Sequence, residues 1–500
     1  MKKTNFPFFI LLILSNWAIL ASAQQPYNLT FNPKNYVTQT LKHEGKTFKV
    51  RAYENIVYVK NPVDTAYQKL NIYIPEDYFE GKNINGYTAK TAPIFFPNKV
   101  GGYMPAQPAS TKDNPMGFGP PPNPNAPPPP PKPLTVVVAL SKGYVVASAG
   151  ARGRTLKDKN DAFTGKAPAG IVDLKAAIRY LKFNDKKMLG DANKIISNGT
   201  SAGGAMSALL GATGNNPDYE PYLTALGAAK GTDDVFGVSA YCPIINLDNA
   251  DMAYEWQFNG INSYKKRAMP PTPPTTAELT DAQIKVSKQL KDLFPAYLNS
   301  LKLKDAKDNL LTLDNEGNGN FKDLVKSYII ASAQKALDGG ANMSAFSFLT
   351  INKDKVTQLD YDAYIKYMER MKTPPAFDGL DNASFENSLF GTASIDKLHF
   401  TDFSSQNSTA GGQKVDKQVV KMMNPMYYIG QVHTTTSKNW RIRHGAKDKD
   451  TGFAVPVIFA TYLQNKGYKV NFGLPWEVPH SGDYDLNELF EWVDSVCKTK

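Results

Sequence analysis

One short stretch restricts the possible folds more than any other: Ile195 to Ala205 reads IISNGTSAGGA. The isoleucines that open it are typical of a buried strand, and the alanine-rich run that follows is typical of a helix. Ser201 lies at the turn, and Gly199 and Gly203 flank it with the spacing G-x-S-x-G. Small residues there allow a sharp reversal in which the central residue keeps a strained backbone and exposes its hydroxyl. The pattern indicates either a nucleophilic serine or a plain Gly/Ser turn.

Strand and helix patterns alternate around this turn. The alternation stops near residue 246 and resumes after residue 423, and the block between reads as helices among polar loops. Alternating strands and helices build a mostly parallel sheet with both faces covered. We therefore expect one α/β domain formed by residues 24–245 and 424–500, with a large, mainly helical lid domain inserted at 246–423. Insertions above the carboxyl edge of a sheet usually cover or shape a site.

The N-terminus predicts export. Lys2 and Lys3 precede the apolar run FFILLIL and the small-residue ending ASAQQ, which is the pattern of a signal peptide, residues 1–23, cleaved after Ala23. Since the rest of the chain has no apolar run of membrane-spanning length, we expect a soluble protein of the periplasm or the medium, without membrane contact after cleavage. The formal net charge of +11 comes from scattered lysines, a distribution that does not favour nucleic acid as a partner.

Three further features have simple interpretations. Residues 119–133 read GPPPNPNAPPPPPKP, which predicts an extended loop insertion of unknown role. The segment Asp314–Val325 is spaced like a calcium loop, but its twelfth residue is Val325 rather than an acid, so a polar loop is expected. Cys242 and Cys497 are the only cysteines; the sequence leaves open whether they pair, and it leaves the number of subunits open.

A nucleophilic serine needs a base, and the base needs an acid that fixes its tautomer. Among five histidines, His480 alone directly follows the last predicted strand, at the carboxyl edge of the sheet. The loop HGAKDKDTGF after the preceding strand offers Asp448 and Asp450, each of which could instead be a turn or capping residue. Serine, aspartate and histidine then follow the chain order of α/β hydrolases, so the sequence predicts a serine hydrolase of the α/β-hydrolase fold.

Acyl transfer also requires two backbone donors for the developing oxyanion. The residue after the nucleophile, Ala202, should supply one N–H. The other should come from the loop after the buried strand APIFFP, where VGGYMP contains Gly101 and Gly102. A glycine pair also suits any tight turn, but the position of this loop favours Gly102.

Four long motifs resemble the bacterial tannases of subtype B: NGTSAGGAMSALLGATGN, VSAYCPIINLDNADMAYEWQFNGIN, WRIRHGAKDKDTGFAVP and LPWEVPHSGDYDL. The resemblance extends over nearly the whole chain after the signal peptide. It implies an α/β hydrolase with a lid domain that cleaves galloyl esters of gallotannins and releases gallic acid, with a polyphenol ester as its small-molecule partner and no metal or organic cofactor. It also implies that Ser201, Asp448 and His480 form the catalytic triad.

The resemblance further implies a binding site for the galloyl ring. Lys372, Glu386 and Asp450 match positions that contact the hydroxyls of gallate in that family. A site built to hydrogen-bond hydroxyls rejects analogues that lack them, because its own polar groups would be left unpaired. Without the resemblance, Lys372 and Glu386 would be interpreted as an exposed pair at helix ends.

Two other functions stay open at this point. The first is an esterase of other phenolic acids, such as ferulate, or a general carboxylesterase. Thr200 and Ser481 stand where fungal tannases and related feruloyl esterases carry cysteines, which argues against that group. The second is a non-catalytic polyphenol-binding protein that keeps the fold, although no predicted triad member is missing.

Overall fold

The computed structural model describes residues 25–113, 133–266 and 275–498. The predicted signal peptide, 1–23, lies outside the described residues, as does the predicted proline-rich loop at 119–133 apart from its last residue. Both remain predictions.

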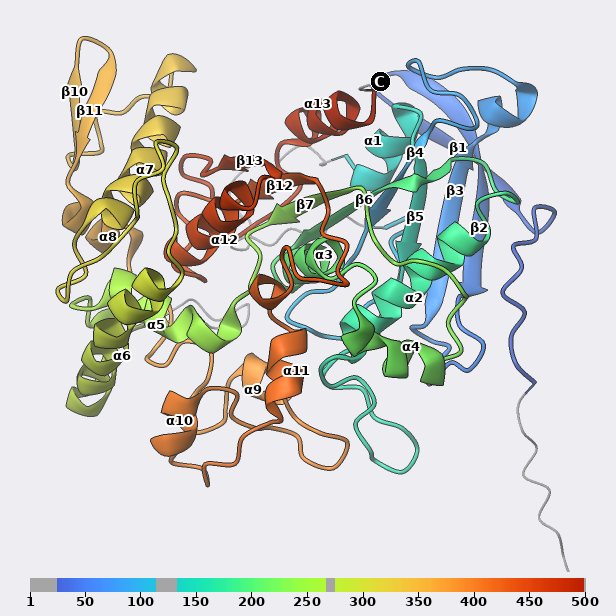
Figure 1. The fold of residues 1–500 in the computed structure, drawn as a ribbon. Helices are drawn as coiled ribbons and strands as arrows, with labels where there is room; N and C mark the ends of the chain where they lie inside the picture. The colour runs from blue at the N-terminus through green and yellow to red at the C-terminus, as the bar shows by residue number, and fades with distance from the viewer. Residues whose placement is uncertain (1–24, 114–132, 267–274, 499–500) are drawn as a thin grey trace, which may run out of the picture.

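A nine-stranded sheet with the order β1-β2-β3-β5-β4-β6-β7-β12-β13 forms the centre of the molecule (Figure 1). The strands from β5 to β13 in that order are parallel, and β1, β2 and β3 extend one edge in antiparallel fashion. Strands β4, β5, β7 and β12 are buried along their whole length, as a sheet covered on both faces requires. The predicted α/β architecture is confirmed. The strands are β1 Val37–His43, β2 Lys46–Val57, β3 Lys69–Pro75, β4 Pro93–Pro97, β5 Val145–Ala149, β6 Asp191–Thr200, β7 Gly237–Tyr241, β12 Asn439–Arg443 and β13 Lys469–Gly473.

Helices cover both faces of this sheet. In Figure 1, α1 and α13 lie together above the sheet, whereas α2, α3 and α12 lie on its other side. The helices of this part are α1 Thr135–Ser141, α2 Ala169–Phe183, α3 Ala202–Ala212, α4 Glu220–Ala225, α12 Ala454–Asn465 and α13 Leu486–Cys497, with short 3₁₀ helices at Glu76–Glu80, Pro217–Tyr219 and Pro425–Tyr427.

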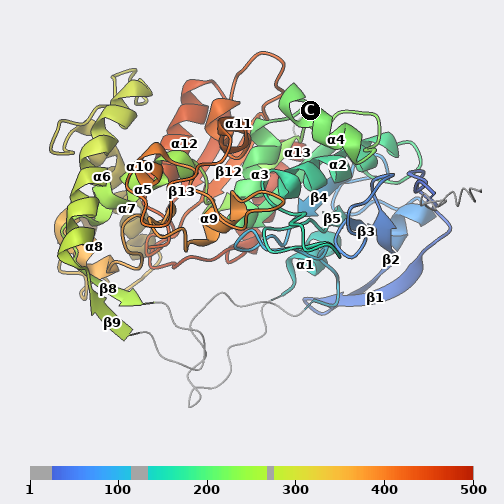
Figure 2. The ribbon, with the colours of Figure 1, turned by 90° about the horizontal axis from the view of Figure 1, so that it is seen from below.

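Between β7 and β12 the chain builds the mainly helical block that the sequence predicts, beside and below the sheet in Figure 1. Figure 2 shows α6, α7 and α8 at one end of the molecule. The block also contains two short antiparallel strand pairs, β8–β9 and β10–β11. The limits 246–423 for this domain remain a prediction. Its elements are α5 Leu247–Phe258, β8 Ser263–Lys266, β9 Thr275–Glu278, α6 Asp281–Ser300, α7 Asn320–Asp338, β10 Leu349–Asn352, β11 Lys355–Leu359, α8 Tyr361–Met368, α9 Phe385–Leu389, α10 Asp402–Gln406 and α11 Lys417–Met422.

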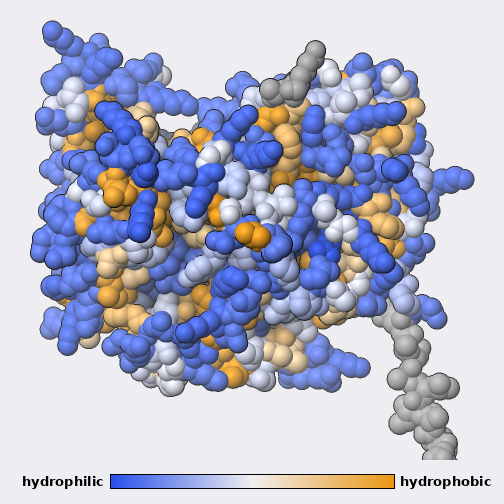
Figure 3. All heavy atoms as spheres, viewed as in Figure 1, coloured by the Kyte–Doolittle hydropathy of each residue, from blue (hydrophilic) through white to orange (hydrophobic). Residues whose placement is uncertain are grey.

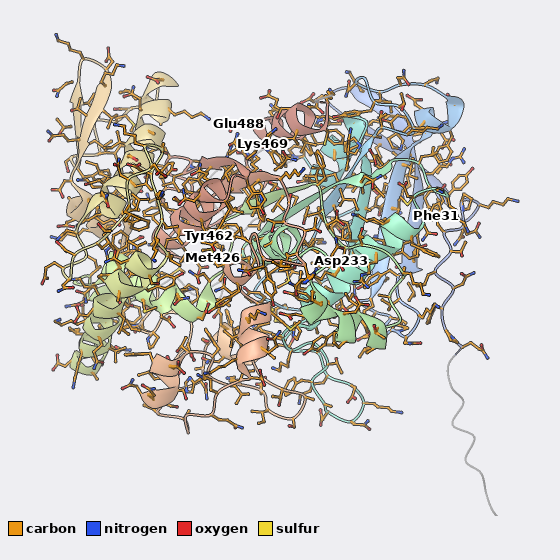
Figure 4. All side chains as sticks on the ribbon, viewed as in Figure 1. Phe31, Asp233, Met426, Tyr462, Lys469 and Glu488 are labelled. Carbon is orange, nitrogen blue, oxygen red and sulfur yellow. The ribbon has the colours of Figure 1, made fainter. Side chains whose placement is uncertain are left out.

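A buried ion cluster fixes helix α2 against the segment that leads into β7. Lys175 Nζ and Arg179 Nε lie 2.7 and 2.9 Å from the two carboxylate oxygens of Asp233. Asp233 lies close to α2 in Figure 4. Buried charges are costly unless they are paired, so this cluster holds one helical layer in a defined place on the sheet.

The segment that imitates a calcium loop is a turn followed by helix α7. One Asp314 carboxylate oxygen accepts hydrogen bonds from the backbone N–H groups of Glu316 and Asn318, at 2.9 and 2.8 Å. The last residue of the pattern, Val325, is buried within α7. The predicted polar loop is therefore an aspartate turn at a helix start.

The two cysteines, Cys242 and Cys497, are buried and free. The face of the molecule in Figure 3 is mostly hydrophilic, with small and separate apolar areas of the kind normal on globular proteins. Among the described helices, none combines the length and the apolar character that crossing a membrane requires.

Candidate active site

The turn between β6 and α3 has the geometry that the G-x-S-x-G pattern predicts. Ser201 has φ 61° and ψ −124°, a strained conformation for a residue with a side chain. A Cβ on Gly199 would lie 2.2 Å from the carbonyl oxygen of Gly203, and one on Gly203 would lie 2.7 Å from Asn98 Oδ1. Both flanking residues must therefore be glycine for the strand to reverse so tightly. The Ser201 N–H donates to the Tyr241 carbonyl at 3.0 Å, which ties the turn to the end of β7.

The two predicted oxyanion donors line the same cavity as Ser201. Gly102 lies in the loop after β4 with φ +54°, and its carbonyl accepts a hydrogen bond of 2.8 Å from Arg154 Nε. Ala202 is the first residue of α3, so its N–H has no acceptor within the helix. Asn98 joins the two segments, because its Nδ2 donates to the carbonyl of Gly203 at 3.0 Å. Loop and turn thus keep a fixed relation to each other.

His480 and Asp448 form a close pair beside this turn. His480 Nδ1 lies 2.8 Å from Asp448 Oδ2, and the Asp448 side chain is fully buried. Asp450 lies on the opposite side of the imidazole, with Oδ2 3.6 Å from His480 Nε2. The two aspartates that the sequence left as alternatives therefore occupy different places: Asp448 holds the Nδ1 side of the ring, and Asp450 stands on the side that faces the cavity.

Ser201 Oγ makes no hydrogen bond to His480 among the residues that the structure describes. Both side chains line one cavity. Hydrogen bonds between nucleophile and base are often long in free enzymes and tighten when substrate binds. The arrangement is compatible with proton transfer from Ser201 to His480.

The electrostatics around His480 favour its charged form. Burial lowers the pKa of His480, but the Asp448 carboxylate and Cys242 together raise it, so the net pKa lies well above its ordinary value. The pKa of Asp448 is lowered although burial opposes this, because the charge of His480 stabilises the carboxylate. Burial raises the pKa of the Cys242 thiol, although His480 opposes this. Burial also lowers the pKa of His444, whose Nδ1 lies 3.7 Å from Asp448 Oδ2.

Lys372, Glu386 and Asp450 line the cavity of about 550 Å³ that also contains Ser201 and His480. Lys372 Nζ forms an ion pair with Asp450 Oδ1 at 2.5 Å. Burial raises the pKa of Glu386 even though Lys372 lowers it, so this carboxyl group is poorly solvated. The interpretation of Lys372 and Glu386 as an exposed pair is therefore wrong. They form one polar wall of the cavity, and Asp450 links that wall to His480.

Three side chains at the site were not anticipated from the sequence. Asn98, which bridges loop and turn, is the first polar residue after the buried strand β4, and that position was a usable signal. Cys242 Sγ lies 3.9 Å from His480 Nε2, directly after β7. Tyr264 reaches the cavity from strand β8, which no sequence pattern indicated.

Solved tannases match the chain over nearly its whole length. The tannin acyl hydrolase from Lactobacillus plantarum is 46% identical with a TM-score of 0.88, and the match covers 94% of this chain and 99% of that one. Tannase from Fusobacterium nucleatum is 51% identical with a TM-score of 0.88, over 94% of this chain and 100% of that one. The chain belongs to the bacterial tannases.

This tannase is therefore an esterase, and the resemblance stated from its motifs is confirmed. A tannin acyl hydrolase solved in complex with ethyl gallate is 46% identical to it, with a TM-score of 0.87 over 94% of this chain and 99% of that one. The family described as BD-FAE matches residues 133–280 of the tannase. A shorter match to the esterase LipC of Mycobacterium tuberculosis is 42% identical over 71 residues, 14% of this chain and 17% of that esterase.

Proposed function

We propose that this protein hydrolyses galloyl esters of gallotannins and simple gallate esters to gallic acid and an alcohol or sugar, through a Ser201–His480–Asp448 triad and an acyl-enzyme. One observation carries the proposal: the same cavity is lined by Ser201 and His480 and by the polar residues Lys372, Glu386 and Asp450. Solved tannin acyl hydrolases in complex with ethyl gallate and with 3,4-dihydroxybenzoate support a phenolic acyl group. The leading sequence 1–23 supports export to the periplasm or the medium.

In the proposed mechanism, His480 Nε2 takes the proton of Ser201 while Oγ attacks the galloyl carbonyl. The Nδ1–H of His480 donates to Asp448 Oδ2, with 2.8 Å between Nδ1 and Oδ2, and the carboxylate stabilises the imidazolium that forms. The N–H groups of Gly102 and Ala202 bind the tetrahedral oxyanion. His480 then gives its proton to the departing oxygen, and water attacks the acyl-enzyme by the same route in reverse.

The polar wall accounts for ring recognition. Three vicinal hydroxyls present donors and acceptors at the end of the ring opposite the ester carbonyl. Lys372 can donate to them, and the carboxylates of Glu386 and Asp450 can accept from them. A ring without these hydroxyls would leave the poorly solvated Glu386 and the Lys372–Asp450 pair without partners, which costs binding energy.

Substrate comparison tests the proposal directly. The purified protein should release acid from methyl gallate far faster than from methyl ferulate, and Glu386→Gln should lower kcat/KM for methyl gallate by about 10- to 100-fold, the range expected for losing a charge-assisted hydrogen bond. Glu316→Gln, an exposed position in the inserted block, is the matched control and should leave kcat/KM unchanged. Similar rates on both esters would support a general phenolic-acid esterase instead. No turnover of either ester would support a polyphenol-binding protein.

The raised pKa of His480 predicts the pH profile. A general base acts only in its neutral form, so kcat/KM for methyl gallate should fall as the pH falls through the pKa of His480 and reach a plateau above it. Because Asp448 raises this pKa, the midpoint should lie above the value of an unperturbed histidine. Initial rates over a pH series measure it, and a midpoint at or below that of free imidazole would argue against His480 as the base.

A further inference from the structure

Helix α5 lies behind the polar wall and binds the segment that carries Lys372. Asp251, Tyr254 and Glu255 have the spacing i, i+3 and i+4, which places them on one face of the helix. All three are buried. Each of them bonds to residues between 370 and 378, although that segment is far away in the sequence.

The hydroxyl of Tyr254 joins two parts of the site. It accepts hydrogen bonds from the backbone N–H groups of Met371 and Lys372, at 3.3 and 3.1 Å. It donates to the carbonyl of Lys449 at 3.1 Å. Lys449 is the neighbour of Asp450, whose carboxylate pairs with the ammonium group of Lys372 at 2.5 Å. One buried oxygen therefore holds together the backbones of the two residues that form the ion pair.

The flanking contacts fix the orientation of the segment. Asp251 accepts from the N–H groups of Phe377 and Asp378 at 2.7 and 3.1 Å. Glu255 pairs with Arg370, whose Nε donates to the carbonyl of Lys372 at 2.7 Å. The ring of Phe377 supports the Lys372 ammonium at 3.9 Å. With both ends held in this way, the Tyr254 hydroxyl sets the separation between the Lys372 segment and the Asp450 loop.

We propose that Tyr254 is a positioning residue for ring recognition: its hydroxyl keeps Lys372 and Asp450 in the register that matches vicinal hydroxyls, without touching the substrate. The inference rests on the proposed function, because it assumes that this ion pair contacts the ring. Tyr254 is fully buried and lies behind the residues that line the cavity. Its effect must therefore pass through the backbone of Lys372 and Lys449.

The test is Tyr254→Phe, which keeps the ring and removes one oxygen. Two N–H groups and one carbonyl then lose a buried partner, and the two segments relax to find others. We expect KM for methyl gallate to rise about ten-fold, the size of one or two lost neutral hydrogen bonds, with a smaller change in kcat. Discrimination, measured as the ratio of kcat/KM for methyl gallate to kcat/KM for methyl 4-hydroxybenzoate, should fall by a similar factor. Hydrolysis of p-nitrophenyl acetate, which presents no ring hydroxyls, should stay close to wild type.

Tyr219→Phe is the matched control. Tyr219 is equally buried, and its hydroxyl donates to the carbonyl of Met422 at 2.7 Å, but it lies outside the cavity lining. It should lose a comparable amount of thermal stability while keeping the wild-type discrimination. If both variants lower Tm alike and neither changes discrimination, Tyr254 is only structural and the inference is overturned.

A double-mutant cycle with Lys372→Met gives a second, independent measure. If Tyr254 acts through Lys372, adding Tyr254→Phe to Lys372→Met should narrow discrimination by much less than it does alone. Full additivity would overturn the inference. If Tyr254→Phe does not fold, Asp251→Asn serves as the second variant, because it loosens the same segment at Phe377 and should also reduce the discrimination. An Asp251→Asn protein with unchanged discrimination would again overturn the inference. A wild-type protein without any preference for gallate would instead refute the proposed function.

Discussion

Replacing Ser201 by alanine is expected to lower kcat for methyl gallate by about a million-fold, the size of effect seen when a serine hydrolase loses its nucleophile. No other group in the described cavity holds a hydroxyl on a strained strand-to-helix turn next to His480, so a substitute route to an acyl-enzyme is not available. The rate is measured as release of gallic acid under saturating ester. Burst-phase acylation should vanish together with steady-state turnover.

The control for Ser201→Ala is Ser481→Ala. Ser481 follows His480, and its exposed hydroxyl donates to the carbonyl of Pro479 at 3.1 Å. Its truncation removes the same atom within the same part of the molecule and should change kcat by less than two-fold, as a surface substitution does. Both variants should keep the wild-type Tm within a few degrees. A Ser201→Ala protein that retains a tenth of wild-type activity would rule out the nucleophile assigned here.

The features that could be predicted from sequence are those fixed by local chemistry. The turn at Ser201 follows from Gly199 and Gly203, whose neighbours leave no room for a Cβ. His480 could be placed because parallel strands bring the loops after them to one sheet edge, so chain order alone located it. The same reasoning found the loop with Gly102, which lies in the cavity with Ser201.

The polar wall could not be derived in this way. Lys372 lies outside regular structure and Glu386 in the five-residue helix α9, so neither has a periodic pattern that indicates which way it faces. Their direction depends on contacts between residues distant in sequence, such as those of α5 and the hydrogen bond of 2.6 Å from Asn387 to Asp378. Only the resemblance to a family located them before the structure did.

The intrinsic secondary-structure preferences of the residues give the wrong structure for one helix of the sheet domain. The run TVVVALS is rich in β-branched residues, which favour strands. It nevertheless forms α1, because five consecutive apolar residues from Val136 to Leu140 are buried there and helix α13 packs beside it. Tertiary burial overrides a weak intrinsic preference.

The sequence left open whether Asp448 or Asp450 is the acid of the triad, and the substitution of Asp448 is expected to have the second large effect on kcat. Asp448→Asn should lower kcat by about ten-thousand-fold. An amide facing Nδ1 favours the tautomer that carries its proton on Nε2, and this tautomer cannot accept the proton of Ser201. The loss of the carboxylate also removes the main group that raises the pKa of His480, so the acid limb of the remaining activity should shift to lower pH.

Asp450→Asn separates the two roles. The Asp450 carboxylate lies 3.6 Å from His480 Nε2 and pairs with Lys372. Its substitution should therefore act mainly on KM for methyl gallate and lower kcat/KM by about 100-fold. The acid limb of the pH profile should remain close to that of the wild type. The measurement is the full pH profile of kcat and kcat/KM for both variants. If Asp450→Asn showed the ten-thousand-fold fall in kcat and Asp448→Asn did not, the acid of the triad would be Asp450. The contact of 2.8 Å between Asp448 and Nδ1 would then have only a structural role.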